Sequence, residues 1–317
     1  MPSGEPDAAV DVVAFGETMA SFRPIDGGPM RMGGAYRLTC AGAESTVAIG
    51  LARLGHAARW VGRVGDDEAG ELVRRNLRAE GVDVDFAVVD PERPTGLMIV
   101  EQRTADVVRV DYRRAGSAGS RLCVDDLLPA LSPAPAVLHC TGITPALGPA
   151  PQAAFLHAIQ AASRAGTVVC LDVNYRARLW SREAASDVLR RIVPHVDVLV
   201  ASEDELPLVD DRVENLFARG VGEVVVKRGA KGATAYTPDE KATVPAGRVT
   251  VRDVVGAGDA FVAGYLCGRL DGLDLAGRTC RGVAVATVAV GSAGDWEGLP
   301  TRDELAYVDM SPGATLR

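Results

Sequence analysis

The chain has 317 residues, of which 47% are hydrophobic and 24% charged, so it is long enough and apolar enough to bury a substantial core. The 35 glycines and 18 prolines are dispersed without a repeating period, which excludes collagen-like and disordered chains. A net charge of -8 and the lack of a long Lys/Arg block argue against nucleic acid or an anionic membrane as a partner, whereas local basic residues could still bind a small anionic substrate.

Short β-branched runs alternate with longer stretches of helical period. The predicted strands are Val12–Gly16, Ala58–Val64, Ala136–Gly142, Thr167–Val173, Val196–Ala201 and Glu223–Arg228. The predicted helices are Ala43–Gly55, Asp67–Gly81, Ala150–Gly166, Ser181–Val193, Gly258–Leu270 and Gly282–Ala293. Strands that are apolar on both faces are typical of a buried parallel sheet, and the helices supply its crossovers. The sequence therefore predicts one α/β domain over residues 1–317, a doubly wound, mostly parallel sheet sandwiched by helices.

Two segments interrupt this alternation. Residues 18–39 and 88–114 alternate apolar with polar or charged residues and contain Pro and Gly turns, as in RPIDGGPMRMGG, so they are expected to form short antiparallel strands. As insertions into a βα framework they predict a small β-strand lid over the carboxyl ends of the parallel strands, where ligands of open α/β sheets bind.

A glycine-rich turn, Gly256-Ala257-Gly258-Asp259, follows a predicted strand, Ala242–Val251, and opens an apolar helix. Backbone N–H groups at such a helix start form an anion hole for a transferred phosphoryl group. The helix dipole favours the ionised form of Asp259, which could then accept the proton of an attacking hydroxyl. Taken alone, the turn also fits an aspartate that merely caps a helix.

The surrounding residues decide between these interpretations. The segment at 41–55, AGAESTVAIGLARLG, is followed by VGRVGDD at 61–67, and RDVVGAGDAFVAGY stands at 252–265. In order and spacing these segments resemble the two signatures of the ribokinase-like (pfkB) family of carbohydrate kinases, and the matches run from about residue 11 to about residue 305. The resemblance implies a ribokinase-like fold, with Asp259 as the catalytic base and Gly256, Ala257 and Gly258 as the anion hole.

A predicted strand ends in a basic turn, VVKRGAKGA, at 225–233. By itself this pattern also fits a solvated loop. In relatives the matching stretch lines the ATP site, so the resemblance implies nucleotide contacts. The residues implied are Lys227, Gly229, Lys231 and Gly232, together with Gly256 and Gly258. The chain contains no G-x-x-x-x-G-K-[ST] motif and is therefore not a P-loop enzyme.

Phosphoryl transfer from ATP requires Mg²⁺. Relatives often carry Asn-x-x-Glu where this chain has SEDE at 202–205, so Glu205 matches the Glu and Ser202 replaces the Asn. Glu205 could contact the metal indirectly through water, or it could be part of an acidic helix start. Val283 stands where relatives often place an Asn near the adenine.

The motif DVNYRARLW at 172–180 resembles 2-keto-3-deoxygluconate (KDG) kinases more than ribokinases. The resemblance implies substrate contacts from Asn174 and Arg176, because a guanidinium suits the carboxylate of a sugar acid. Asp172 and Arg176 could instead pair with each other.

Other segments support a sugar-acid site. YRRAGSA at 112–118 is similar to the segment with which KDG kinases close over the substrate, implying roles for Tyr112 and Arg114. Gly42 matches a glycine beside the sugar hydroxyls, Asp295 in GDWEGLP matches a substrate-contacting Asp, and Gly16-Glu17 resembles the first strand ending of these enzymes. Thr46 replaces an Asn of the family.

The expected activity is therefore ATP-dependent phosphorylation of the terminal hydroxyl of KDG or a close analogue. A fructokinase or another hexose or pentose kinase is the alternative, and a non-catalytic sugar-binding sensor is a third hypothesis. The expected partners are a sugar acid and ATP, without nucleic acid or membrane. The edge of the lid could pair with a second lid, which would give a homodimer.

The cysteines, six in number, are scattered, form no C-x-x-C pair and mostly stand in apolar runs, which predicts reduced core residues. The first residues, MPSGEPDAAVDVV, lack the basic and apolar regions of a signal peptide, and no apolar run approaches the length of a membrane span. We therefore expect a cytoplasmic protein, with a loosely ordered tail after Met310.

Overall fold

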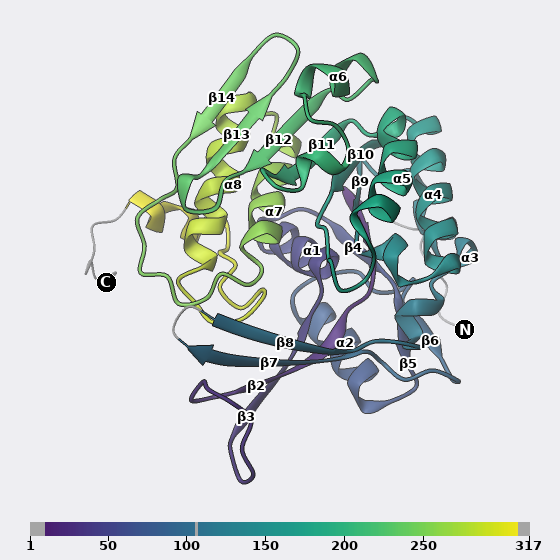
Figure 1. The fold of residues 1–317 in the computed structure, drawn as a ribbon, viewed down its shortest axis with the longest axis vertical. Coiled ribbons are helices and arrows are strands. Elements are labelled where there is room, and N and C mark those ends of the chain that lie inside the picture. The colour runs from purple at the N-terminus through teal and green to yellow at the C-terminus, as the bar shows by residue number, and fades with distance from the viewer. Residues whose placement is uncertain (1–9, 105–106, 310–317) are drawn as a thin grey trace.

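The computed structural model describes residues 10–104 and 107–309. An eight-stranded sheet runs through its centre in the order β14-β13-β12-β11-β10-β9-β1-β4 (Figure 1). Pairing is parallel from β12 to β4, whereas β13 and β14 are antiparallel to their neighbours. The strands are β1 Val12–Phe15, β4 Ala58–Val61, β9 Val137–Thr141, β10 Val168–Asp172, β11 Val198–Ser202, β12 Glu223–Lys227, β13 Ala233–Tyr236 and β14 Lys241–Val244. This arrangement confirms the predicted mostly parallel α/β sheet.

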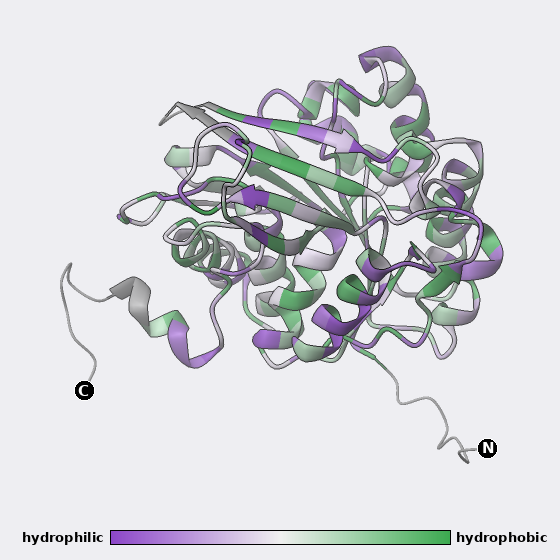
Figure 2. Ribbon diagram, turned by 90° about the horizontal axis from the view of Figure 1, so that it is seen from below, coloured by the Kyte–Doolittle hydropathy of each residue, from purple (hydrophilic) through white to green (hydrophobic). Residues whose placement is uncertain are grey.

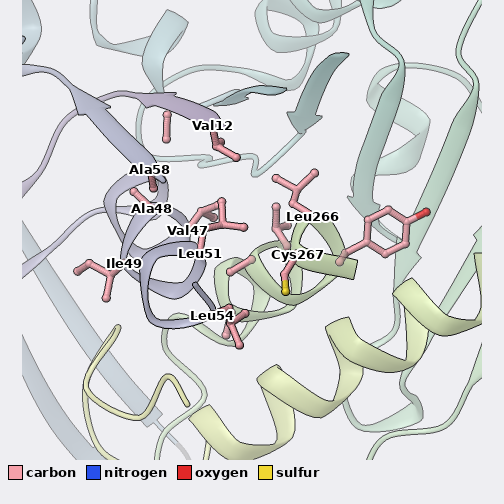
Figure 3. Packing of buried hydrophobic residues seen from close by; sticks show 14 of the residues in the cluster. Val12, Val47, Ala48, Ile49, Leu51, Leu54, Ala58, Leu266 and Cys267 are labelled. Carbon is pink, nitrogen blue, oxygen red and sulfur yellow. The ribbon is translucent and has the colours of Figure 1, made fainter. Parts of the chain in front are cut away.

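Helices cover both faces of this sheet. One face packs against α1 (Ala43–Arg53), α2 (Glu68–Ala79), α7 (Ala257–Leu270) and α8 (Leu275–Ala289), and the other against α3 (Val124–Leu127), α4 (Pro149–Arg164), α5 (Arg182–Ile192) and α6 (Val213–Ala218). In Figure 3 the side chains of Val12 on β1, Val47 on α1 and Leu266 on α7 meet in the first of these two layers. Each fully buried side chain of this size stabilises the fold by about 1.5–3 kcal/mol.

Short 3₁₀ helices lie in the connections, at Ala118–Arg121, Pro129–Leu131, Thr144–Leu147, Val193–His195, Leu206–Leu208, Gly229–Lys231 and Asp303–Asp309. Figure 2 shows the layering as hydropathy, with hydrophobic strands inside and helices that turn hydrophilic residues outward. That pattern follows from the need of each amphipathic helix to bury one face.

A separate four-stranded sheet forms the lid, in the order β3-β2-β7-β8. Its strands are β2 Met19–Pro24, β3 Tyr36–Ala41, β7 Leu97–Thr104 and β8 Val107–Arg113, and it lies at the lower end of the main sheet in Figure 1. Both predicted insertions contribute to it. The first residues of the second insertion behave differently, because β6 (Val88–Asp90) pairs with β5 (Arg63–Gly65) in a small sheet of its own.

Three predicted elements differ from the structure by more than two residues at one or both ends. The strand predicted at Ala58–Val64 breaks at Gly62, where an added Cβ would lie 2.4 Å from the Gly16 carbonyl, because the chain turns there towards the small β5–β6 sheet. The strand predicted at Ala242–Val251 ends at Val244, and the rest is an exposed coil. The last helix begins at Leu275 rather than Gly282, because Asp274 caps it by accepting the Gly277 amide at 2.7 Å.

The cysteines carry no disulfide and four of them are buried, which fits the prediction of reduced core residues. Cys280 is exposed and Cys123 half-buried, so the prediction is wrong for these two. Within residues 10–104 and 107–309, no helix is long and apolar enough to cross a membrane. The tail predicted to be loose after Met310 lies outside the described residues.

Candidate active site

The turn at residues 256–259 opens α7 between the main sheet and the lid. Gly256 is the N-cap and has a φ of +73°, and an added Cβ would lie 2.1 Å from the Asp295 carbonyl oxygen, so only glycine fits. Ala260 donates its amide to the Gly256 carbonyl at 2.8 Å, which starts the helix. In the described part of the chain the amides of Gly258 and Asp259 have no backbone acceptor. They are therefore the donors that could bind an anion.

Ala257 is predicted to be part of the anion hole, but its amide is already used within the turn. Its amide already donates to the Val254 carbonyl at 3.3 Å, which closes the turn that leads into α7. The anion-hole donors offered by this structure are therefore Gly258 and Asp259, with Gly256 beside them.

Asp259 stands in the first turn of α7, half-buried. Asn174, at φ +39° just after β10, donates its side-chain amide to Asp259 Oδ1 at 3.2 Å. Loss of hydration and the nearby Asp172 raise the pKa of Asp259 to about 6, against the lowering effect of Lys227 and Arg176. A carboxyl of this kind is ionised at neutral pH and basic enough to accept a proton.

Lys227 ends β12 and points towards the turn. Its Nζ lies 2.6 Å from Asp172 Oδ2, and a Cβ added to Gly258 would lie 3.2 Å from the same nitrogen. Burial acts to lower the pKa of Lys227, but Asp172, Glu205 and Asp259 outweigh it and the net shift is upward. The side chain therefore keeps its positive charge beside the anion-hole amides.

A cavity of about 680 Å³ opens on the α8 side of this turn. Four of the residues predicted to contact the nucleotide line it: Lys227, Gly229, Gly232 and Gly258. Val283, which the sequence comparison aligned with an Asn near the adenine of relatives, lines it too. Lys231 is exposed and does not line this cavity, and neither does Gly256.

A second, smaller cavity of about 90 Å³ lies under the lid, on the other side of the turn. Most of the predicted substrate residues meet there: Gly42, Tyr112, Arg114, Arg176, Asp259 and Asp295 line it, together with Gly256. Asn174 does not line it and reaches the site through Asp259. The two cavities thus meet at residues 256–259, with the candidate base on the smaller one.

The two arginines of the small cavity differ in their partners. Arg114 Nη2 lies 2.6 Å from Glu17 Oε2, and its guanidinium stands 5.7 Å from the Tyr112 ring centre. Arg176 is exposed, and its hydrogen bond in the described structure goes to the Tyr175 carbonyl at 3.2 Å. The alternative that Asp172 pairs with Arg176 is wrong, because Asp172 pairs with Lys227.

Glu44 is a site residue that the sequence interpretation missed. It is 1% exposed in the first turn of α1, lines the small cavity, and accepts hydroxyl donors from Thr141 at 2.7 Å and Thr144 at 3.1 Å. Burial raises its pKa to about 7. The signal that could have found it is a charged residue in an otherwise apolar helix start.

Asp295 and Glu205 lie at the edges of the site. Burial and the neighbouring Asp259 raise the pKa of Asp295 to about 7. Glu205 is buried and accepts the backbone amides of Tyr175 at 2.8 Å and Ser202 at 2.9 Å. Each of its oxygens keeps a lone pair for a water molecule, so an indirect metal contact stays a prediction.

Comparison with known proteins identifies the family. The profile of the pfkB family carbohydrate kinases matches residues 9–302. This chain belongs to the pfkB family. It is 34% identical over 306 residues to the 2-dehydro-3-deoxygluconokinase (KDG kinase) of Bacillus subtilis, covering 94% of each chain. It is also 34% identical over 264 residues to fructokinase-1 of Zea mays, covering 80% of this chain and 81% of that one.

Among solved structures, the 2-dehydro-3-deoxygluconokinase of Thermotoga maritima superposes with a TM-score of 0.87 at 26% identity, covering 96% of this chain and 99% of the other. These likenesses confirm the predicted family and ribokinase-like fold. As a pfkB carbohydrate kinase, the chain is a phosphotransferase, and the paired cavities on either side of residues 256–259 have the layout that such an enzyme needs.

Proposed function

We propose that this pfkB kinase transfers the γ-phosphoryl group of ATP to the terminal hydroxyl of 2-keto-3-deoxygluconate or a close analogue. One observation carries the proposal: the small cavity holds Arg176, a cation that forms no salt bridge within the described residues, together with Asp259 at the start of α7. A pocket that combines a guanidinium with a base suits a substrate with a carboxylate at one end and a reacting hydroxyl at the other.

The base acts first on the hydroxyl. Asp259 accepts its proton while the oxygen attacks the γ-phosphorus, so an O–P bond forms as the bond between the γ-phosphorus and the β–γ bridging oxygen breaks and ADP leaves. Asn174 holds the carboxylate through its 3.2 Å hydrogen bond. The Gly258 and Asp259 amides bind the charge on the transferred group, an effect worth about 10²–10³ in rate for one such donor.

The larger cavity would hold ATP, with its phosphates towards Lys227 and Gly258. The residues present fit this group, because Gly258, whose amide has no backbone acceptor in the described residues, and the charged Lys227 line the same cavity. Mg²⁺, bound to the phosphates, would neutralise part of their charge, and Glu205 would contact it through water.

The two arginines of the small cavity differ in whether their charge is already balanced. Glu17 already balances the charge of Arg114, and Ser117 donates a further hydrogen bond to the same carboxylate. Arg176 is therefore the cation left to bind the carboxylate of a sugar acid, while Tyr112 and Arg114 line the same cavity and Arg114 offers a further N–H group.

A kinetic comparison tests this proposal against the fructokinase alternative, which the likeness to the Zea mays enzyme keeps open. The quantity to measure is kcat/KM for KDG, 2-keto-3-deoxygalactonate, fructose and ribose. We expect a sugar acid to be preferred. Preference for neutral fructose would refute the role of Arg176, and an ADP-release assay without any sugar-dependent signal would favour a non-catalytic sensor.

We further propose a cytoplasmic enzyme that dimerises through its lid. The lid has open edges at β3 and β8, and Leu38 on β3 is 49% exposed. Exposed strand edges with apolar side chains pair readily. Light scattering of the wild type and of Leu38→Lys tests this: a dimer that becomes monomeric supports lid pairing, and a monomeric wild type refutes it.

A further inference from the structure

The distal part of the larger cavity, away from Gly258, is a slot between α8 and the coil that follows β14. Apolar groups form its walls: Val283 and Ala286 from α8, Val290 directly after this helix, and Val249 and Val251 from the coil. Val249 is 41% exposed and Val251 55% exposed, so the coil presents apolar surface that nothing in the described structure covers. Because the phosphates belong at the Lys227 end, this slot is the place for the nucleobase.

The polar side chains that line the cavity either form hydrogen bonds or ion pairs within the protein or cannot distinguish one purine base from another. The Thr287 hydroxyl donates to the Val283 carbonyl at 2.7 Å and accepts the Gly247 amide at 3.3 Å, so it holds the coil against α8. Lys227 is paired with Asp172 at the phosphate end. Arg248 is exposed and offers only N–H donors, which suit N7 of any purine and O6 of guanine.

Adenine and guanine differ in the donors and acceptors on their edges. A site built from fixed hydrogen-bonding partners rejects the wrong base by about 10⁴–10⁵, whereas an apolar pocket discriminates between similar ligands by about 10² or less. From the walls of this slot we infer that the enzyme accepts purine nucleoside triphosphates in general as phosphoryl donors, guanine nucleotides included. This inference rests on the proposed function for the identity of the cavity as the nucleotide site.

Calorimetric titration of the full chain with ADP and with GDP, in the presence of Mg²⁺ and without sugar, tests the inference. We expect dissociation constants for ADP and GDP that agree within about 100-fold. Weaker GDP binding than this, with ADP bound, would overturn the inference and leave the proposed kinase function intact. Failure to bind either nucleotide would overturn both, and binding of both without turnover of any sugar would contradict the proposed function alone.

Two variants of α8 test whether the nucleobase binds in the slot. Ala286→Leu fills the slot, so overpacking should weaken the binding of ADP and of GDP by the same factor, about tenfold or more. Ala276→Leu, on an exposed position of the same helix, is the matched control and should leave both affinities unchanged. The melting temperatures of both variants establish that they are folded. If Ala286→Leu weakened the binding of only one of the two nucleotides, or of neither, the inference would be overturned.

Discussion

Lys227 Nζ lies 2.6 Å from Asp172 Oδ2, although the two residues end strands that are separated by β11. Asp172 ends β10, whose following residues lead to Asn174 and Arg176 on the substrate side, and Lys227 ends β12 on the nucleotide side. Asp172 is 1% exposed and Lys227 is largely buried, so each charge depends on the other. The ion pair thus holds the ammonium at the junction of the two cavities.

Removing one partner of this pair should cost both stability and activity. Asp172→Asn removes the carboxylate that is paired with the buried ammonium, so we expect the free energy of unfolding in urea to fall by about 3 kcal/mol. We also expect kcat/KM for ATP to fall by about 100-fold, because Lys227 loses its position beside Gly258.

The double variant Asp172→Asn/Lys227→Met separates the two effects. Without a buried charge it should regain most of the lost stability, while kcat/KM for ATP stays low because the ammonium is gone. Recovery of catalysis in the double variant would contradict the role of Lys227 at the phosphates.

The pH dependence of the reaction should report Asp259. Because its pKa is raised to about 6, most of the base is protonated and inactive below this pH, so kcat/KM for the sugar should rise with pH with a half-point near 6. The measurement is a pH profile at saturating MgATP. A half-point near 3.8, the ordinary value for an aspartate, would show that Asp259 is neither desolvated nor influenced by Asp172.

Glu44 should make folding stability fall as pH rises. Its pKa is about 7 in the folded chain against 4.5 ordinarily, so the folded state binds the extra proton and its advantage is lost as pH rises from about 4.5 to about 7. Glu44→Gln keeps an acceptor for Thr141 and Thr144 but carries no charge.

Relative to wild type, Glu44→Gln should therefore gain stability between pH 5 and pH 8, by up to about 3 kcal/mol. Melting temperatures across this range check the trend. Glu68→Gln, on the exposed first turn of α2, is the control and should track the wild type. A gain that is the same at pH 5 and pH 8 would mean that Glu44 ionises normally.

Arg176 should determine the preference for an acid. Arg176→Met removes a charge-assisted hydrogen bond worth about 1.5–3 kcal/mol, so kcat/KM for KDG should fall about 10- to 100-fold while that for fructose changes little. Arg164→Met, exposed on α4, is the control. An equal loss on both sugars would assign Arg176 a structural rather than a recognition role.

Much of this architecture could be predicted because the local patterns agree with the tertiary structure. Strands apolar on both faces could only be central in a sheet, and the glycines at 256 and 258 with Asp259 fixed the helix start whose geometry the structure confirms. The boundaries that failed were decided by tertiary contacts. Val249 and Val251 have strand propensity, yet the coil that carries them runs past α8, where Thr287 holds it through Gly247.

The pairing of charged and polar side chains could not be predicted from the sequence, because the partners lie far apart in the chain. Arg114 and Glu17 are 97 positions apart in the chain, and Glu44 meets Thr141 across the same separation, so only the fold reveals them. The alternative that Asp172 pairs with Arg176 is wrong for the same reason, since Arg176 is close in sequence while Lys227 is close in space.

The most direct test of the account is the Asp259→Asn variant, assayed for turnover of KDG with ATP and, by calorimetry, for binding of KDG. Loss of the base should lower kcat by about 10²–10⁴-fold, while the dissociation constant of the sugar acid stays near that of the wild type, because Arg176 and the lid residues are untouched. Turnover within about tenfold of the wild type would contradict Asp259 as the base.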